Sequence, residues 1–126
     1  MKKKVLLVED EAVTATGLER ILWRLGYDVM GPCLAGEVAL RMAAQERPDV
    51  ALMDIRLVGR ISGITTAIEL RELYDVPSVF LTGQNTEQAR LLAQEARPAA
   101  FLIKPVSEHD LHQTIQAALQ QSGPAG

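Results

Sequence analysis

The sequence predicts a single α/β domain built on one doubly wound, five-stranded parallel sheet of strand order 2-1-3-4-5, flanked by five helices. Short apolar runs alternate with longer segments of helical periodicity along the whole chain. Because βαβ crossovers are right-handed, such alternation gives a parallel sheet with helices on both faces. The length of 126 residues suits one domain of about 100–150 residues. We expect that domain to span 1–121, with 122–126 forming a flexible tail or the start of a linker.

The strands are predicted from apolar runs bounded by turn residues. The first and third runs are continuous, as they are in central parallel strands. The second is less hydrophobic and contains Pro32, which fits an edge strand, and Pro77 opens the fourth, where its missing N–H costs least. The order 2-1-3-4-5 satisfies these constraints and puts the switch point between the first and third strands. The predicted strands are 4–8, 28–33, 49–53, 77–81 and 100–103.

The helices are predicted from apolar residues that recur at spacings of three and four. Gly26 ends the first helix as a C′ glycine would, and Pro48 stops the second. The predicted helices are 12–25, 36–46, 63–73, 85–96 and 107–121. The apolar faces of the first, fourth and fifth are formed by Leu18, Ile21, Leu22 and Leu25, by Ala89, Leu92, Ala93 and Ala96, and by Leu111, Ile115, Ala118 and Leu119.

Composition excludes several function classes. With 13 basic and 16 acidic residues the net charge is −3, which argues against direct contact with nucleic acid. No stretch approaches the roughly 20 apolar residues of a membrane helix, so we expect no membrane partner. The single cysteine, Cys33, rules out an intramolecular disulfide and suits a reducing, cytoplasmic environment.

Polar side chains follow four of the predicted strands. Glu9 and Asp10 follow the first, Asp54 the third, Thr82 the fourth and Lys104 the fifth. The carboxyl ends of parallel strands share one edge of a sheet, and ligands bind at that edge. We therefore expect these five side chains to converge on one site.

Three carboxylates at one edge need positive charge nearby. A like-charged pair about 4 Å apart costs about 4 kcal/mol at an effective dielectric of 20. Carboxylate oxygens without sulfur or imidazole suit a hard cation such as Mg²⁺, and Lys104 supplies a further positive charge. Taken singly, each residue has an ordinary explanation: Asp10 as a helix N-cap, Asp54 as a loop acid, Thr82 as a turn residue and Lys104 as a surface lysine. Their occurrence together, in this order, favours a functional site.

The set resembles the receiver domain of two-component response regulators, over about residues 3–120. The resemblance is to chemotaxis-regulator-like receivers and implies a flavodoxin-like fold with the same strand order. The motifs that carry it are the acid pair Glu9-Asp10, Leu52-Met53-Asp54-Ile55-Arg56-Leu57, Leu81-Thr82-Gly83 and Lys104-Pro105.

The resemblance implies that Asp54 is the phosphoacceptor, which attacks a phosphohistidine on a sensor histidine kinase or phosphotransfer protein. It also implies that Mg²⁺ is held by Glu9, Asp10, Asp54 and the backbone carbonyl of Arg56. Lys104 would bind a phosphoryl oxygen. Such a domain is not an enzyme in the usual sense, because it catalyses only its own phosphorylation and dephosphorylation.

The resemblance further implies a switch. Thr82 would turn its hydroxyl to the phosphoryl group and Phe101 would move inward, which changes the face of the fourth helix, fifth strand and fifth helix. The bond before Pro105 would be cis. The expected partners are the kinase and a downstream effector domain or protein, and a homodimer remains open.

Two alternatives belong to other classes. One is a receiver-like interaction module that works without phosphorylation. The other is an enzyme, either a small Mg²⁺-dependent phosphatase or a nucleotide-binding α/β domain. The sequence disfavours the phosphatase because Arg56 stands where an aspartyl phosphatase usually has its second acid. The first strand is also followed by acids rather than by a glycine-rich phosphate loop.

Overall fold

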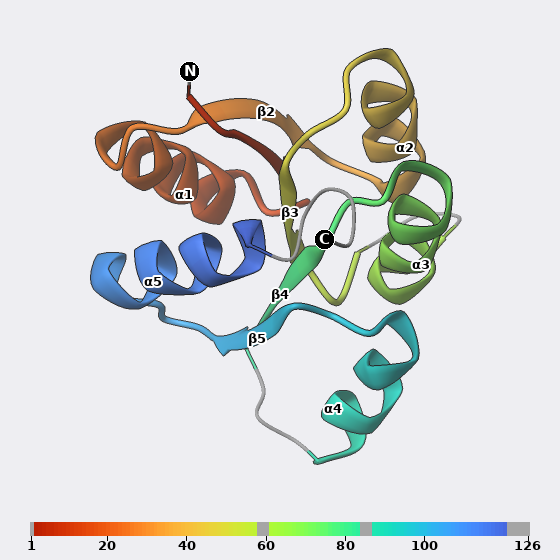
Figure 1. Ribbon diagram of the computed structural model, residues 1–126. Helices are drawn as coiled ribbons and strands as arrows, with labels where there is room; N and C mark the ends of the chain where they lie inside the picture. The colour runs from red at the N-terminus through yellow and green to blue at the C-terminus, as the bar shows by residue number, and fades with distance from the viewer. Residues whose placement is uncertain (1, 58–60, 84–86, 121–126) are drawn as a thin grey trace.

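The computed structural model of the protein describes residues 2–57, 61–83 and 87–120 (Figure 1). Across these residues the chain forms one five-stranded parallel sheet in the predicted order β2-β1-β3-β4-β5. The strands are β1 (Lys4–Val8), β2 (Asp28–Cys33), β3 (Val50–Asp54), β4 (Ser78–Thr82) and β5 (Ala100–Ile103). The helices are α1 (Ala12–Arg24), α2 (Gly36–Gln45), α3 (Gly63–Tyr74), α4 (Glu87–Ala93) and α5 (Glu108–Leu119), with a 3₁₀ turn η1 (Gln94–Ala96) after α4. The predicted tail 122–126 and the side chains of Ala89 and Leu92 lie outside what is described.

Helices cover both faces of the sheet, α1 and α5 on one and α2, α3 and α4 on the other (Figure 1). Successive side chains of a strand point to opposite faces, so each buried strand supplies two cores. Leu7 and Leu52 pack in the α1–α5 core, whereas Leu6 and Phe80 pack in the other. All four are fully buried. This two-sided burial is why the sequences of the central strands are continuous apolar runs.

Strand β2 lies at the edge, as the proline in it predicted. Its pairing with β1 shifts register between Leu6 and Val8, and the Gly31–Pro32 peptide bond is cis. Beyond the shift, the carbonyl of Cys33 accepts a hydrogen bond from the N–H of Glu9 at 2.9 Å. The edge strand therefore fixes the backbone of the first acidic residue after β1.

Helix ends follow local capping chemistry. The alternative in which Asp10 caps α1 is wrong, because Glu11 occupies the N-cap position. Gly26 has φ +93° just beyond the C-cap, as predicted for a C′ glycine. Ser62 and Ser107 are the N-caps of α3 and α5, and each accepts a backbone N–H three residues on at 3.0 Å. Asp10 therefore does not cap α1.

Some element boundaries differ from the prediction. Strand β4 begins at Ser78 rather than at Pro77, whose ring nitrogen has no hydrogen to donate to a ladder. The α-helical part of the fourth helix ends at Ala93, and the last turn tightens to 3₁₀ before Arg97 adopts a left-handed conformation with φ 48°. In the described part of the chain, no helix combines the length and apolarity needed to cross a bilayer.

Candidate functional site

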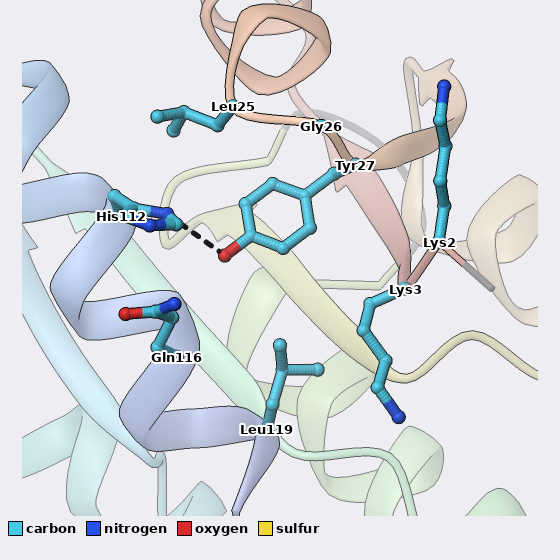
Figure 2. Close-up of a pocket in the computed structure, with 8 residues that line it drawn as sticks. All are labelled: Lys2, Lys3, Leu25, Gly26, Tyr27, His112, Gln116 and Leu119. Carbon is cyan, nitrogen blue, oxygen red and sulfur yellow. Dashed lines mark hydrogen bonds between the residues drawn. The ribbon is translucent and has the colours of Figure 1, made fainter.

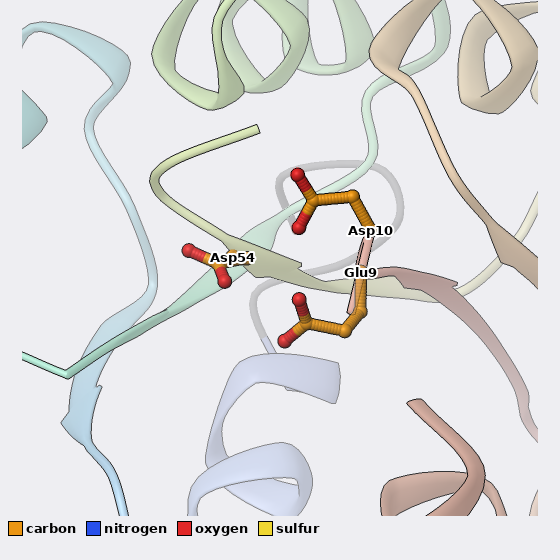
Figure 3. Close-up of side chains that lie close together, drawn as sticks. All are labelled: Glu9, Asp10 and Asp54. Atoms are coloured by element: carbon orange, nitrogen blue, oxygen red, sulfur yellow. The ribbon is translucent and has the colours of Figure 1, made fainter. Parts of the chain in front are cut away.

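Three carboxylates gather at the carboxyl ends of β1 and β3 (Figure 3). Glu9 and Asp10 follow β1, and Asp54 is the last residue of β3, which pairs directly with β1. One oxygen from each carboxylate lies within 4.8 Å of the others. The structure thus brings the predicted acids together at the switch point of the sheet.

Lys104 reaches into this cluster from the loop after β5. Its Nζ donates to Glu9 Oε1 at 2.8 Å and to Asp54 Oδ2 at 3.0 Å. Its backbone N–H donates to the carbonyl of Thr82 at 2.7 Å, which ties the loop to the end of β4. The bond to Pro105 is cis, as expected. One ammonium group therefore bridges two of the three acids.

Burial shifts the pKa values of two of these charged groups. Glu9 is fully buried, and burial raises its pKa, although the hydrogen bonds from Lys104 and from the N–H of Glu11 partly offset the effect. Burial alone would lower the pKa of Lys104, but its hydrogen bonds to Glu9 and Asp54 outweigh that effect and raise it. The lysine is therefore held charged, and it is the main counter-charge to a buried carboxylate.

Asp54 is oriented from two sides. Its Oδ1 accepts the N–H of Arg56 at 2.8 Å, while its Oδ2 faces Lys104. Its side chain keeps 13% of its surface exposed, so the carboxylate remains accessible. The backbone N–H of Arg56 is thus tied to the Asp54 carboxylate.

Gly63 is a residue that sequence reasoning missed. It begins α3, and a Cβ there would lie 2.6 Å from the carbonyl oxygen of Asp54 and 2.9 Å from that of Ile55. Both neighbours are backbone atoms, so only glycine lets the helix approach the end of β3 this closely. The Ser62-Gly63 pair just before a helical period was the available signal.

Thr82 and Phe101 lie on the same face of the sheet. Thr82 ends β4 and is buried, and Phe101 on β5 pairs in register with Phe80, two residues before Thr82. Phe101 is partly buried, and the guanidinium of Arg90 lies 5.3 Å from its ring centroid. The structure places the two predicted switch residues on adjacent strands, with α4 covering the aromatic ring.

A groove adjoins the carboxylate cluster on the α1 side. It encloses about 460 Å³ and runs between α1 and the loop that follows β5. Val13, Leu18 and Ile21 line one wall, and Lys104 and Pro105 the other. Val13 is 83% exposed, which leaves an apolar surface directly beside the site.

The donor set defines the chemistry that the site can support. Hard carboxylate oxygens favour Mg²⁺ over softer metals, and Mg²⁺ typically combines one or two carboxylates with waters and phosphate oxygens. The carboxylate oxygens of Glu9, Asp10 and Asp54 lie close enough together to hold one ion, so the residues present fit a divalent cation. Asp54 is a partly exposed carboxylate, suited to nucleophilic attack on phosphorus once the negative charge of the carboxylates is neutralised.

Comparisons with known proteins agree on one family. A family model of the response regulator receiver domain matches residues 5–116. A probable transcriptional regulator, ycf27 of Guillardia theta, is 35% identical over 124 residues, which is 98% of this chain and 48% of that protein. The chain thus spans about half the length of this curated relative.

Solved structures give the same result. The signal receiver domain of a modulated diguanylate cyclase from Desulfovibrio desulfuricans G20 is 37% identical, with a TM-score of 0.90 over 96% of each chain. The BeF3-activated N-terminal receiver domain of RstA from Klebsiella pneumoniae is 27% identical, with a TM-score of 0.85 over 94% of this chain and 99% of that one.

Proposed function

This chain belongs to the response regulator receiver domains, the signalling domains of two-component systems, and on that premise we propose that Asp54 is its phosphoacceptor. The observation that carries the proposal is the position of Asp54 Oδ2, 3.0 Å from Lys104 Nζ, inside a cluster of three carboxylates. The donor is a phosphohistidine on a sensor histidine kinase or phosphotransfer protein. Such a donor belongs in the cytoplasm, and the buried free thiol of Cys33 fits that compartment.

The transfer is a nucleophilic substitution at phosphorus. An oxygen of Asp54 forms the new P–O bond as the N–P bond of the phosphohistidine breaks, and the electron pair of that bond returns to the imidazole nitrogen. The N–H of Arg56 holds Oδ1 in place while the reaction proceeds at the other oxygen. Lys104 then exchanges its contact with the Asp54 carboxylate for a phosphoryl oxygen.

Mg²⁺ would be held by the carboxylates of Glu9, Asp10 and Asp54 and by the backbone carbonyl of Arg56. When bound, it supplies neutralisation of the charge on the phosphoryl oxygens. Glu9 is fully buried, so its carboxylate supplies negative charge at a fixed position in the site. Positioning of this kind accounts for most of the catalysis in phosphoryl transfer.

Phosphorylation then switches the face formed by α4, β5 and α5. The modification adds about two negative charges and three acceptor oxygens at Asp54. The hydroxyl of Thr82, at the end of the next strand, donates to one of them, and Phe101 follows inward on the same face. The altered face is read by a downstream effector domain or protein.

The groove beside Lys104 is where the phosphodonor docks. A donor histidine must approach Asp54 from the open edge of the sheet, and the adjoining apolar wall includes the exposed Val13. Val13→Asp should therefore slow transfer from a phosphorylated kinase at least tenfold. Its rate with the small donor acetyl phosphate should stay within twofold of that of the unmodified protein.

Intact-mass measurement tests the proposal. With Mg²⁺ and acetyl phosphate, the protein should gain the mass of one phosphoryl group. Asp54→Asn should gain nothing, whereas the matched surface control Asp28→Asn should behave as the unmodified protein. No gain at saturating donor, or an equal gain in Asp54→Asn, would overturn the assignment.

A further inference from the structure

We propose that a pocket at the amino-terminal edge of the sheet binds small organic anions that have a flat apolar body. Residues from three distant segments line it: the start of the chain, the turn between α1 and β2, and α5 from His112 onward (Figure 2). It encloses about 490 Å³. Lys2 and Lys3 precede β1 here, at the opposite end of the strands from Asp54. The pocket is therefore distinct from the phosphorylation site.

Two lysines, Lys2 and Lys3, line the pocket. Lys2 and Lys3 are exposed, and neither makes an ion pair with any residue that the structure describes. Lys4 differs, because Glu46 pairs with its ammonium group and Asp49 accepts its backbone N–H. Asp28, the residue after Tyr27, is exposed and close to Lys4, and no carboxylate lines the pocket itself. In a chain of net charge −3, this is a local positive site.

Hydrogen-bonding side chains complete the polar side of the pocket. The hydroxyl of Tyr27 and Nδ1 of His112 are hydrogen-bonded at 3.2 Å (Figure 2). Tyr27 is only 6% exposed, and burial raises its pKa, so the phenol stays protonated. His112 uses Nδ1 in this bond, which leaves its other ring nitrogen, Nε2, for a ligand. Gln116, one turn further along α5, adds an amide.

The apolar side of the pocket selects for the body of the ligand. Leu25 and Leu119 line it together with the ring of Tyr27. In Figure 2 the two lysines lie on one side of that ring, and His112 and Gln116 lie on the other. The side chains of Lys2 and Lys3 extend in opposite directions in this view, so an anionic head group can pair with one of them while a flat body rests on the ring of Tyr27 and the two leucines.

The size of the site favours a small ligand over a polyanion. Nucleic-acid surfaces present a basic stripe with many phosphate contacts, whereas this pocket has two lysines in an acidic chain. A cavity of about 490 Å³ falls in the range of small-molecule sites, about 300–1,000 Å³.

Benzoate is a suitable probe, with benzamide as its neutral isostere and acetate as the head group alone. In an NMR titration of ¹⁵N-labelled protein at low salt, benzoate should shift the amides of residues 25–27 and 112–119. The double variant Lys2→Gln/Lys3→Gln should weaken binding at least fivefold. Arg20→Gln/Arg41→Gln removes the same net charge from exposed positions elsewhere and should change affinity less than twofold.

The proposal fails if benzamide binds as well as benzoate, because an anion site must distinguish them. It fails equally if the arginine variant loses as much affinity as the lysine variant, or if the shifts centre on Lys104. Absence of any shift at 50 mM benzoate would also overturn it. Since Asp54 plays no part, Asp54→Asn should bind benzoate normally, which keeps this test independent of the phosphoacceptor assignment.

Discussion

Replacing Lys104 by glutamine should make the stability of the domain depend on Mg²⁺. The change removes a charge that is hydrogen-bonded to Glu9 at 2.8 Å and to Asp54 at 3.0 Å, but it keeps a side chain of similar length. Glu9 is fully buried, so the variant leaves a carboxylate without its main counter-charge. The buried carboxylate without its counter-charge raises the free energy of the folded state but not that of the unfolded chain.

The magnitude follows from the burial of the partners. Removing one member of a fully buried ion pair costs about 3–5 kcal/mol. The Lys104 side chain is 27% exposed, and water at that end reduces the cost, so we expect a loss of about 2 kcal/mol. For a domain of this size, 1 kcal/mol shifts Tm by about 4 °C, so the metal-free variant should melt about 8 °C lower.

The pH dependence has a definite sign. The raised pKa of Glu9 means that the folded state holds the proton more tightly than the unfolded state does. The resulting stabilisation is present at low pH and is lost as pH rises through the folded pKa. Without the hydrogen bond from Lys104 this pKa rises further, so the deficit of the variant should be smaller at pH 5 than at pH 8.

Thermal unfolding followed by circular dichroism provides the assay, at both pH values, with EDTA or with 10 mM Mg²⁺. A cation that binds only the folded state stabilises it, and in Lys104→Gln it no longer competes with an ammonium group. Mg²⁺ should therefore reverse at least half of the decrease in Tm. The Tm of Lys104→Arg should be close to that of the unmodified protein. Lys4→Gln breaks a surface ion pair, and Mg²⁺ should raise its Tm no more than it raises that of the unmodified protein. Equal melting of Lys104→Gln with EDTA and with Mg²⁺ would refute the reasoning.

Three further predictions concern other parts of the fold. Arg47→Lys should lower the free energy of unfolding in urea by about 1 kcal/mol, because lysine cannot reproduce the guanidinium hydrogen bonds to carbonyls at the end of α3, and an unchanged midpoint would contradict this. Gly63→Ala should cost about 1–3 kcal/mol in the same assay and slow phosphorylation by acetyl phosphate, since its Cβ would lie 2.6 Å from the Asp54 carbonyl oxygen. Burial raises the pKa of Cys33 to about 11, from an ordinary value near 9, which lowers its thiolate fraction about 100-fold at pH 8. Its reaction with a disulfide reagent should therefore be at least 100-fold slower in the native protein than in denaturant.

The sequence predicted the site best for those residues that lie at the ends of strands. Apolar runs located β1, β3, β4 and β5 to within one residue, and a parallel sheet allows only one edge for the residues that follow them. That constraint predicted the meeting of Glu9, Asp54 and Lys104, although Lys104 lies 95 residues from Glu9. Convergence of this kind is a property of topology, and topology can be inferred from periodicity.

Contacts that depend on side-chain reach could not be inferred in that way. Tyr27 and His112 are 85 residues apart, and neither lies at a strand end, so nothing in the pattern pairs them. Arg47 appeared as one more charged residue, yet its guanidinium reaches the carbonyl of Tyr74 at 2.7 Å. Side-chain directions of this kind become visible only after the helices have been packed on the sheet.

Local capping competed with function at the first helix. Asp is a favoured N-cap, which made Asp10 ambiguous from the sequence alone. The helix begins at Ala12, as predicted, and Glu11 occupies the N-cap position without a side-chain capping hydrogen bond. Which residue becomes the N-cap depends on the path of the backbone between β1 and α1. That path cannot be predicted from a single sequence.

Chemical mapping of the phosphorylated position tests the central claim most directly. Borohydride reduces an aspartyl phosphate to homoserine, so protein treated with Mg²⁺ and acetyl phosphate, then reduced and digested, reports the modified residue by mass. Homoserine at position 54 alone, dependent on Mg²⁺ and strongly diminished in Lys104→Gln, is the predicted result. Homoserine at another carboxylate, or at position 54 in equal yield with EDTA, would contradict the account.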